Sequence, residues 1–246
     1  MRRLACCIAL LLPLLALAQS PDTAREKRWA DEITPAILVG DAVDLALPSG
    51  RKFLGILAMA PNARGGVVLV HGMGVHPDWG LLNPLRSQLV DHGYTTLSVQ
   101  MPVLAADVKG DRYPPLFPEA AERIRAAVAL LRSKGVAKIA IVSHSMGSRM
   151  ANAFLVEPGS VPVEAWVAIG ITAPYAKADA FRAPILDIYG EKDFPDVLSG
   201  ARARADIIRR IRGSGQVEVA GADHYFNGHE AELVKQVRIF LDARLR

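Results

Sequence analysis

Cysteine is almost absent from this chain, and its two cysteines, Cys6 and Cys7, both lie close to the start. If the first 18 residues are removed, the remaining chain has no disulfide, no thiol nucleophile and no thiolate ligand for a metal. The six histidines form neither His-Glu-x-x-His nor a His-x-His cluster. We therefore expect no metal and no cofactor.

A strong charge of one sign is also lacking. The formal net charge is +4, and it falls to +2 without Arg2 and Arg3. This balance is too weak to indicate a nucleic-acid partner. Four neighbouring arginines are predicted to form the solvent-exposed side of a helix: Arg202, Arg204, Arg209 and Arg210.

The first residues have the pattern of a secretory signal peptide. Residues 1–3 are cationic, residues 4–17 form an apolar run broken only by Pro13, and Ala16 and Ala18 are small residues at the two positions that a signal peptidase reads. We predict a cleaved signal peptide over residues 1–18, a single domain over residues 19–246, and a periplasmic or secreted location. A retained membrane anchor is the alternative, but the apolar run is short for a spanning helix. No integral membrane segment is expected after cleavage.

The pattern of apolar residues changes after residue 60. Residues 41–47 and 51–60 read as two strands joined by a Pro-Ser-Gly turn, which predicts an antiparallel hairpin. Short apolar strands then alternate with helices, which predicts right-handed crossovers and a mostly parallel sheet with helices on both faces. The strands are expected at residues 67–70, 95–100, 138–142, 165–169, 185–189 and 216–219. The helices are expected at residues 81–92, 119–134, 146–156, 206–211 and 230–245, with a short one within 21–33.

Ligands of such a sheet bind at the carboxyl ends of its strands. The strand at residues 138–142 is followed by Ser-His-Ser-Met-Gly and then by a helix, which is the pattern of a nucleophile elbow. The turn is so tight that positions 143 and 147 need small residues, although glycine is more usual at the first of them. Ser145 is therefore the predicted nucleophile; the alternative is that it only caps the helix.

An acid and a base follow two later strands. Asp193 comes after a strand and a glycine turn, and Glu191 and Asp196 are its rivals. His224 lies on the loop between the last strand and the last helix, with His229 as the nearest rival. The order Ser145, Asp193, His224 is that of the α/β-hydrolase catalytic triad.

A fourth loop suggests how a developing negative charge is held. The strand at residues 67–70 is followed by His-Gly-Met-Gly, whose glycines let the backbone approach a substrate. We expect the N–H groups of Met73 and Met146 to form the oxyanion hole. Substrate contacts are expected from residues that flank these donors: Gly72, Gly74 and His144.

These motifs resemble the α/β-hydrolase family over essentially the whole mature chain. A narrower resemblance, to an uncharacterised family of exported bacterial proteins with this fold, rests on His-Gly-Met-Gly-Val-His-Pro-Asp-Trp at residues 71–79, Pro-Leu-Arg at 84–86 and Thr-Thr-Leu-Ser-Val-Gln-Met-Pro at 95–102. The resemblance implies the α/β-hydrolase fold and export, but it implies no substrate because that family carries no established reaction.

The predicted function is that of a serine hydrolase acting through an acyl-enzyme, namely a carboxylesterase or thioesterase on small to medium acyl substrates. Its partner would be a small-molecule acyl ester or thioester. Serine at position 145, rather than Asp or Cys, disfavours dehalogenase and dienelactone-type chemistry. A peptidase or amidase with the same triad is one alternative, and a retired scaffold acting in binding or envelope assembly is another. Residues 103–118 and 171–184 are candidate lids, and Trp79 is expected to pack against the first helix rather than line the mouth of the site.

Overall fold

An N-terminal hairpin begins the sheet of this protein. The computed structural model describes residues 19–245, so the predicted signal peptide lies outside the described residues. Strands β1 (Asp41–Ala46) and β2 (Lys52–Ala58) are antiparallel, as predicted, and pair from Asp41 with Leu57 to Ala46 with Lys52. β2 then pairs antiparallel with β4, which joins the hairpin to the rest of the sheet.

The eight-stranded sheet has the order β1-β2-β4-β3-β5-β6-β7-β8, and every pair from β4 to β8 is parallel. The central strands are buried on both faces, which is why they read as short runs of apolar residues in the sequence. The remaining strands are β3 (Gly65–Val70), β4 (Tyr94–Val99), β5 (Ile139–His144), β6 (Ala165–Ile169), β7 (Ile185–Lys192) and β8 (Gly215–Asp223). The predicted mostly parallel sheet is confirmed.

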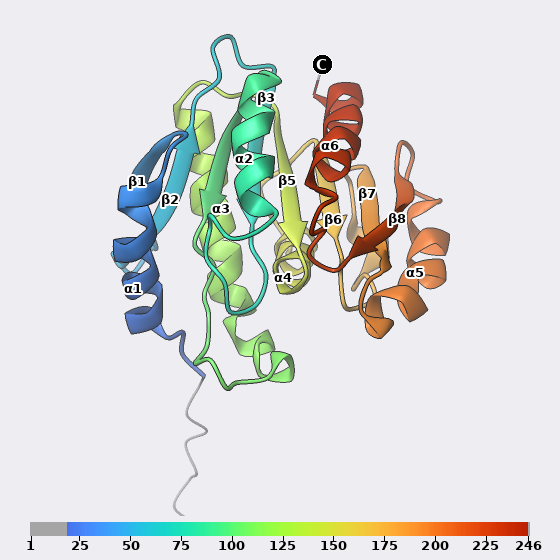
Figure 1. Cartoon of the computed structure of the whole chain (residues 1–246), viewed down its shortest axis with the longest axis horizontal. Coiled ribbons are helices and arrows are strands. Elements are labelled where there is room, and N and C mark those ends of the chain that lie inside the picture. The colour runs from blue at the N-terminus through green and yellow to red at the C-terminus, as the bar shows by residue number, and fades with distance from the viewer. Residues whose placement is uncertain (1–18, 246) are drawn as a thin grey trace, which may run out of the picture.

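Helices cover both faces of the sheet, also as predicted, and Figure 1 shows α2 and α6 on one side with α3 and α4 on the other. One buried apolar cluster joins the sheet to α2 and α6, and a second joins it to α3 and α4. The α-helices are α1 (Thr23–Ile33), α2 (Leu82–Asp91), α3 (Phe117–Ser133), α4 (Met146–Leu155), α5 (Pro195–Ile208) and α6 (Glu230–Arg244). The 3-10 turns are η1 (Thr34–Ala36), η2 (Gly110–Arg112), η3 (Pro114–Leu116) and η4 (Ala178–Ala180). In the described part of the chain, no helix combines the length and apolar character needed to cross a membrane.

Helix α5 differs from its prediction. It begins at Pro195 rather than at residue 206, and it ends at Ile208. The prediction that Arg204 faces solvent is wrong, because this residue is 1% exposed and its Nε donates to both carboxylate oxygens of Asp187, at 3.2 and 3.0 Å. An arginine can be buried in this way only when a carboxylate partner is buried with it.

The carboxyl ends of the parallel strands lie at the lower edge of the sheet in Figure 1. At this edge α4 starts so close to the end of β3 that a Cβ atom on Gly147 would lie 2.3 Å from the carbonyl oxygen of His71 and 2.6 Å from that of Val70. Both atoms belong to the backbone and cannot rotate away. Glycine at position 147 is therefore a condition for the approach of β3 to the start of α4.

We predict that Gly147→Ala lowers the free energy of unfolding by about 1–3 kcal/mol, because overpacking against the backbone outweighs the better helix propensity of alanine. Gly215→Ala is the matched control, since no atom lies within 4 Å of its Cβ position. Urea unfolding of both variants measures the difference, and equal stabilities would contradict the steric argument.

Candidate active site

Ser145 lies in a strained turn between β5 and α4. Its φ of 55° and ψ of −119° place a residue with a side chain in a region that favours glycine, at a cost of about 1–3 kcal/mol. The turn is anchored because the N–H of Ser145 donates to the carbonyl of Ile169 on β6, at 2.8 Å. This strand-turn-helix geometry lifts the Ser145 hydroxyl to the edge of the sheet.

Three predicted side chains meet at that edge. The Nε2 atom of His224 lies 3.0 Å from the Oγ atom of Ser145, and its Nδ1 atom lies 2.5 Å from Oδ1 of Asp193. Asp193 also accepts hydrogen bonds from the N–H groups of Phe194, at 2.7 Å, and Gly190, at 3.4 Å. With the carboxylate on Nδ1, the proton of the imidazole sits there, which leaves Nε2 free to accept the hydroxyl proton.

The rival residues lie elsewhere. Glu191 accepts the N–H of Gly221 at 2.7 Å, His229 is paired with the carbonyl of Asn227, and Asp196 is exposed in the first turn of α5. The geometry therefore singles out Asp193 and His224 from their neighbours.

The imidazole of His224 is held on three sides. Phe194 stacks on it with ring centroids 3.9 Å apart, and a Cβ atom on Gly170, whose φ is 53°, would lie 3.0 Å from its Cε1. On the third side the ring of His144 lies 4.8 Å from it, centroid to centroid, and Nε2 of His144 lies 3.0 Å from the backbone carbonyl oxygen of His224. These contacts fix the ring before any substrate arrives.

His144 was expected to contact the substrate, and the structure places it beneath the loop of His224 with 2% exposure. A carbonyl can only accept, so Nε2 of His144 donates and its Nδ1, which has no hydrogen-bond partner, carries no proton. Burial, with a smaller contribution from the nearby His224, lowers the pKa of His144 to about 3. His144 is therefore a neutral hydrogen-bond donor to the backbone that carries the base.

The predicted oxyanion loop approaches Ser145, the predicted nucleophile, closely, since a Cβ atom on Gly72 would lie 3.2 Å from Cβ of Ser145. His71 is fully buried; its Nδ1 donates to the carbonyl of Gly72 at 2.8 Å and its Nε2 accepts the N–H of Met101 at 2.9 Å. Because a trans peptide is planar, binding the carbonyl of Gly72 turns the N–H of Met73 the opposite way, away from His71. Burial lowers the pKa of His71 to about 3, so this arrangement is independent of pH near neutrality.

Large apolar side chains surround the triad. Met73, Phe194 and Tyr225 are 45%, 43% and 38% exposed, and each follows a different strand. The ring of Trp79 contacts that of Tyr225, with centroids 5.3 Å apart, and Tyr225 in turn lies beside His224, while the packing of Trp79 against the first helix stays a prediction. Trp79 thus borders the mouth of the site.

The first candidate lid reaches this site. A Cβ atom on Gly110, in η2, would lie 3.3 Å from Cε of Met146 and 3.5 Å from Sδ of Met73. In the second candidate lid, residues 171–184, the side chains of Tyr175 and Phe181 pack against Trp166 in the core.

In residues 19–245 no group of three or more His, Cys, Asp or Glu side chains could hold a metal ion.

Ser143, at the position where glycine is more usual, has a partner that the sequence pattern did not reveal. Its Oγ accepts the indole N–H of Trp166 at 2.8 Å and lies 3.0 Å from Oγ of Ser148. Trp166 has no exposed surface, so its N–H would otherwise be buried without an acceptor.

We predict that Ser143→Gly destabilises the protein by about 1–3 kcal/mol, although it restores the usual residue, because it leaves the Trp166 N–H unsatisfied. A double-mutant cycle with Trp166→Phe separates this loss from the flexibility of glycine. The penalty should shrink in the Trp166→Phe background, and an equal penalty in both backgrounds would refute the pairing.

A second prediction concerns acid stability. Unfolded histidine titrates near pH 6.5, whereas His71 and His144 have pKa values of about 3 in the folded protein. Between about pH 3 and 6.5 the unfolded chain therefore binds more protons than the folded protein. The free energy of unfolding should consequently fall as the pH is lowered from about 6.5 toward 3. His144→Gln keeps a donor for the carbonyl of His224 and removes one titration, so the decline should become shallower by up to about 1.4 kcal/mol per pH unit. Urea unfolding at several pH values measures the slope, and an unchanged slope would contradict the neutral state of His144.

Comparison with known proteins agrees with this architecture. A family model described as "Alpha/beta hydrolase domain" matches residues 63–194, and one described as "Protein of unknown function (DUF3530)" matches residues 2–120. A comparison with curated proteins gives no match.

Several solved structures share the fold. A dienelactone hydrolase from Anabaena variabilis is 21% identical to this chain and has a TM-score of 0.71. The superposition covers 83% of this chain and 97% of the dienelactone hydrolase. The Pyrococcus furiosus esterase Pf2001 is 15% identical, with a TM-score of 0.67 and coverages of 84% and 93%. Est1E from Butyrivibrio proteoclasticus is 15% identical, with a TM-score of 0.65 and coverages of 81% and 97%. At these identities the likeness is one of fold.

Proposed function

Because this chain belongs to the alpha/beta hydrolase family, we propose that it is a serine hydrolase acting through an acyl-enzyme, most specifically a carboxylesterase or thioesterase for small to medium acyl groups. The observation that carries the proposal is the hydrogen-bonded series from Ser145 Oγ through His224 to Asp193. We further propose that the signal peptide is cleaved and that the enzyme acts in the periplasm or outside the cell.

In the proposed reaction, Nε2 of His224 takes the hydroxyl proton as Ser145 attacks the acyl carbon. Asp193 keeps the imidazole in the required tautomer and stabilises its positive charge. The tetrahedral oxyanion accepts hydrogen bonds from the N–H groups of Met73 and Met146. His224 then passes the proton to the leaving alcohol or thiol, and a water molecule releases the acid from the acyl-enzyme by the same roles.

The apolar surround supports an uncharged acyl group. Phe194 and Tyr225 expose apolar surface beside His224, and Met73 exposes apolar surface on the loop that approaches Ser145, so a ligand that covers them removes that surface from water. Two of the similar structures are named as esterases. The predicted nucleophile position holds serine rather than cysteine, so the acyl-enzyme would be an oxygen ester.

We expect a fluorophosphonate probe to label the wild-type protein and Ser145→Ala to abolish that labelling. Asp193→Asn should lower kcat on p-nitrophenyl butyrate by about ten-thousandfold, because the imidazole is then held in the wrong tautomer. Asp196→Asn, which changes an exposed acid on the same segment, is the control and should behave as wild type.

A panel of p-nitrophenyl esters, thioesters and amides of graded length decides the substrate class. The enzyme proposal is contradicted if the folded wild-type protein neither reacts with the probe nor hydrolyses any member of the panel. That result would favour a retired hydrolase scaffold that acts in binding or envelope assembly. Faster cleavage of amides than of esters would favour a peptidase.

A further inference from the structure

The N-terminal helix α1 reaches the oxyanion loop through one side chain. Nη2 of Arg25 donates to the carbonyl of Gly74 at 3.1 Å, and Nη1 donates to the carbonyl of Leu104 at 2.7 Å. We propose that Arg25 is a positioning residue of α1 that holds the oxyanion loop in its working conformation. This inference rests on the proposed function, because it assigns a role within the same reaction.

Arg25 is not a freely moving surface arginine. Its guanidinium lies 4.4 Å from the ring centroid of Trp29, one turn later on α1, and a stacked planar fork loses little freedom when it binds two carbonyls. Both carbonyls belong to loops that follow neighbouring strands, β3 and β4. The side chain therefore ties the two loops to each other as well as to α1.

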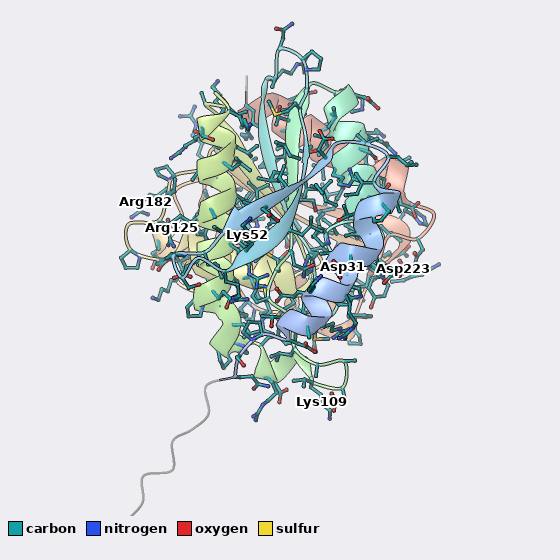
Figure 2. The ribbon with its side chains drawn as sticks, turned by 90° about the vertical axis from the view of Figure 1, so that its left-hand side faces the viewer. Asp31, Lys52, Lys109, Arg125, Arg182 and Asp223 are labelled. Carbon is teal, nitrogen blue, oxygen red and sulfur yellow. The ribbon has the colours of Figure 1, made fainter. Side chains whose placement is uncertain are left out.

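The helix itself is fixed by a buried ion pair beside Arg25. Glu26 is 7% exposed and accepts from Nη2 of Arg123, which is fully buried, with both carboxylate oxygens at 3.1 and 2.9 Å. Nη1 of Arg123 donates to the carbonyl of Gln100 at 2.9 Å. Breaking a buried pair by removing one partner is costly, so α1 is held at a defined place. Figure 2 looks onto α1 beside the β1–β2 hairpin.

The oxyanion loop is held from both sides of Met73. On one side His71 binds the carbonyl of Gly72, and on the other Arg25 binds the carbonyl of Gly74. Gly74 has a φ of 70°, so the peptide that follows it can turn readily unless its carbonyl is bound. Arg25 supplies that bond, and its loss should free the side of Met73 that His71 does not control.

The test compares Arg25→Ala and Arg25→Lys with Lys27→Ala. Lys27 is the matched control: it lies on the same helix and pairs with Asp31, labelled in Figure 2, on the exposed face of α1. Two readouts are needed: amide hydrogen exchange of residues 71–76, and kcat and KM on p-nitrophenyl butyrate. Thermal unfolding checks that each variant is folded, and Arg25→Gln replaces Arg25→Ala if the latter does not fold.

Arg25→Ala should speed exchange in residues 71–76 and lower kcat about tenfold, with KM changed by less than about twofold, because a misplaced donor weakens transition-state binding more than substrate binding. Arg25→Lys should recover part of kcat, since one ammonium group can bind one of the two carbonyls. Lys27→Ala should match the wild type in both readouts.

The proposal is overturned if Arg25→Ala leaves exchange at residues 71–76 unchanged, or if Lys27→Ala produces the same changes. A rise in KM with unchanged kcat would also overturn it and would indicate a substrate contact instead. If the wild type hydrolyses nothing, the proposed function fails, but the exchange measurement still decides whether Arg25 holds the loop.

Discussion

The candidate active site depends on one tight turn. Ser145 can adopt its strained backbone only because β5 and α4 hold it from two sides and Ile169 accepts its N–H. The same turn brings the start of α4 against the end of β3, which leaves no room for a side chain at Gly147. A single backbone constraint thus places the proposed nucleophile Ser145, the predicted donor at Met146 and the loop of Gly72.

Three histidines surround this turn, and their partners give them different roles. His71 and His144 are buried without a carboxylate and bind backbone groups, so they stay neutral and act as fixed donors and acceptors. His224 alone has a buried carboxylate, Asp193, on one nitrogen and a hydroxyl on the other. A carboxylate stabilises the imidazolium that forms when a proton arrives, so the site supports proton transfer at one histidine and rigidity at the other two.

The sequence was enough to predict the sheet and the meeting of Ser145, Asp193 and His224, because strands buried on both faces are apolar and the residue after each strand must lie at one edge. It could not predict features set by distant partners. Arg204 has a local pattern typical of a solvated helix, yet Asp187 on β7 draws it into the interior. Trp79 likewise contacts Tyr225, and Ser143 accepts a hydrogen bond from Trp166; both partners are remote in sequence.

The N-terminal helix is the clearest case of such a distant partner. From its composition α1 reads as a polar segment ahead of the hairpin, and it precedes the residues that the hydrolase family model matches. Its adjacent residues Arg25 and Glu26 nevertheless contact loops that follow β3 and β4. The hydrogen bonds among Ser145, His224 and Asp193 involve no residue of α1, whereas the loop of Met73 is bound by His71 on one side and by Arg25 of α1 on the other. If Arg25 holds this loop as proposed, the donor at Met73 depends on α1, whereas the donor at Met146 depends on the turn of Ser145.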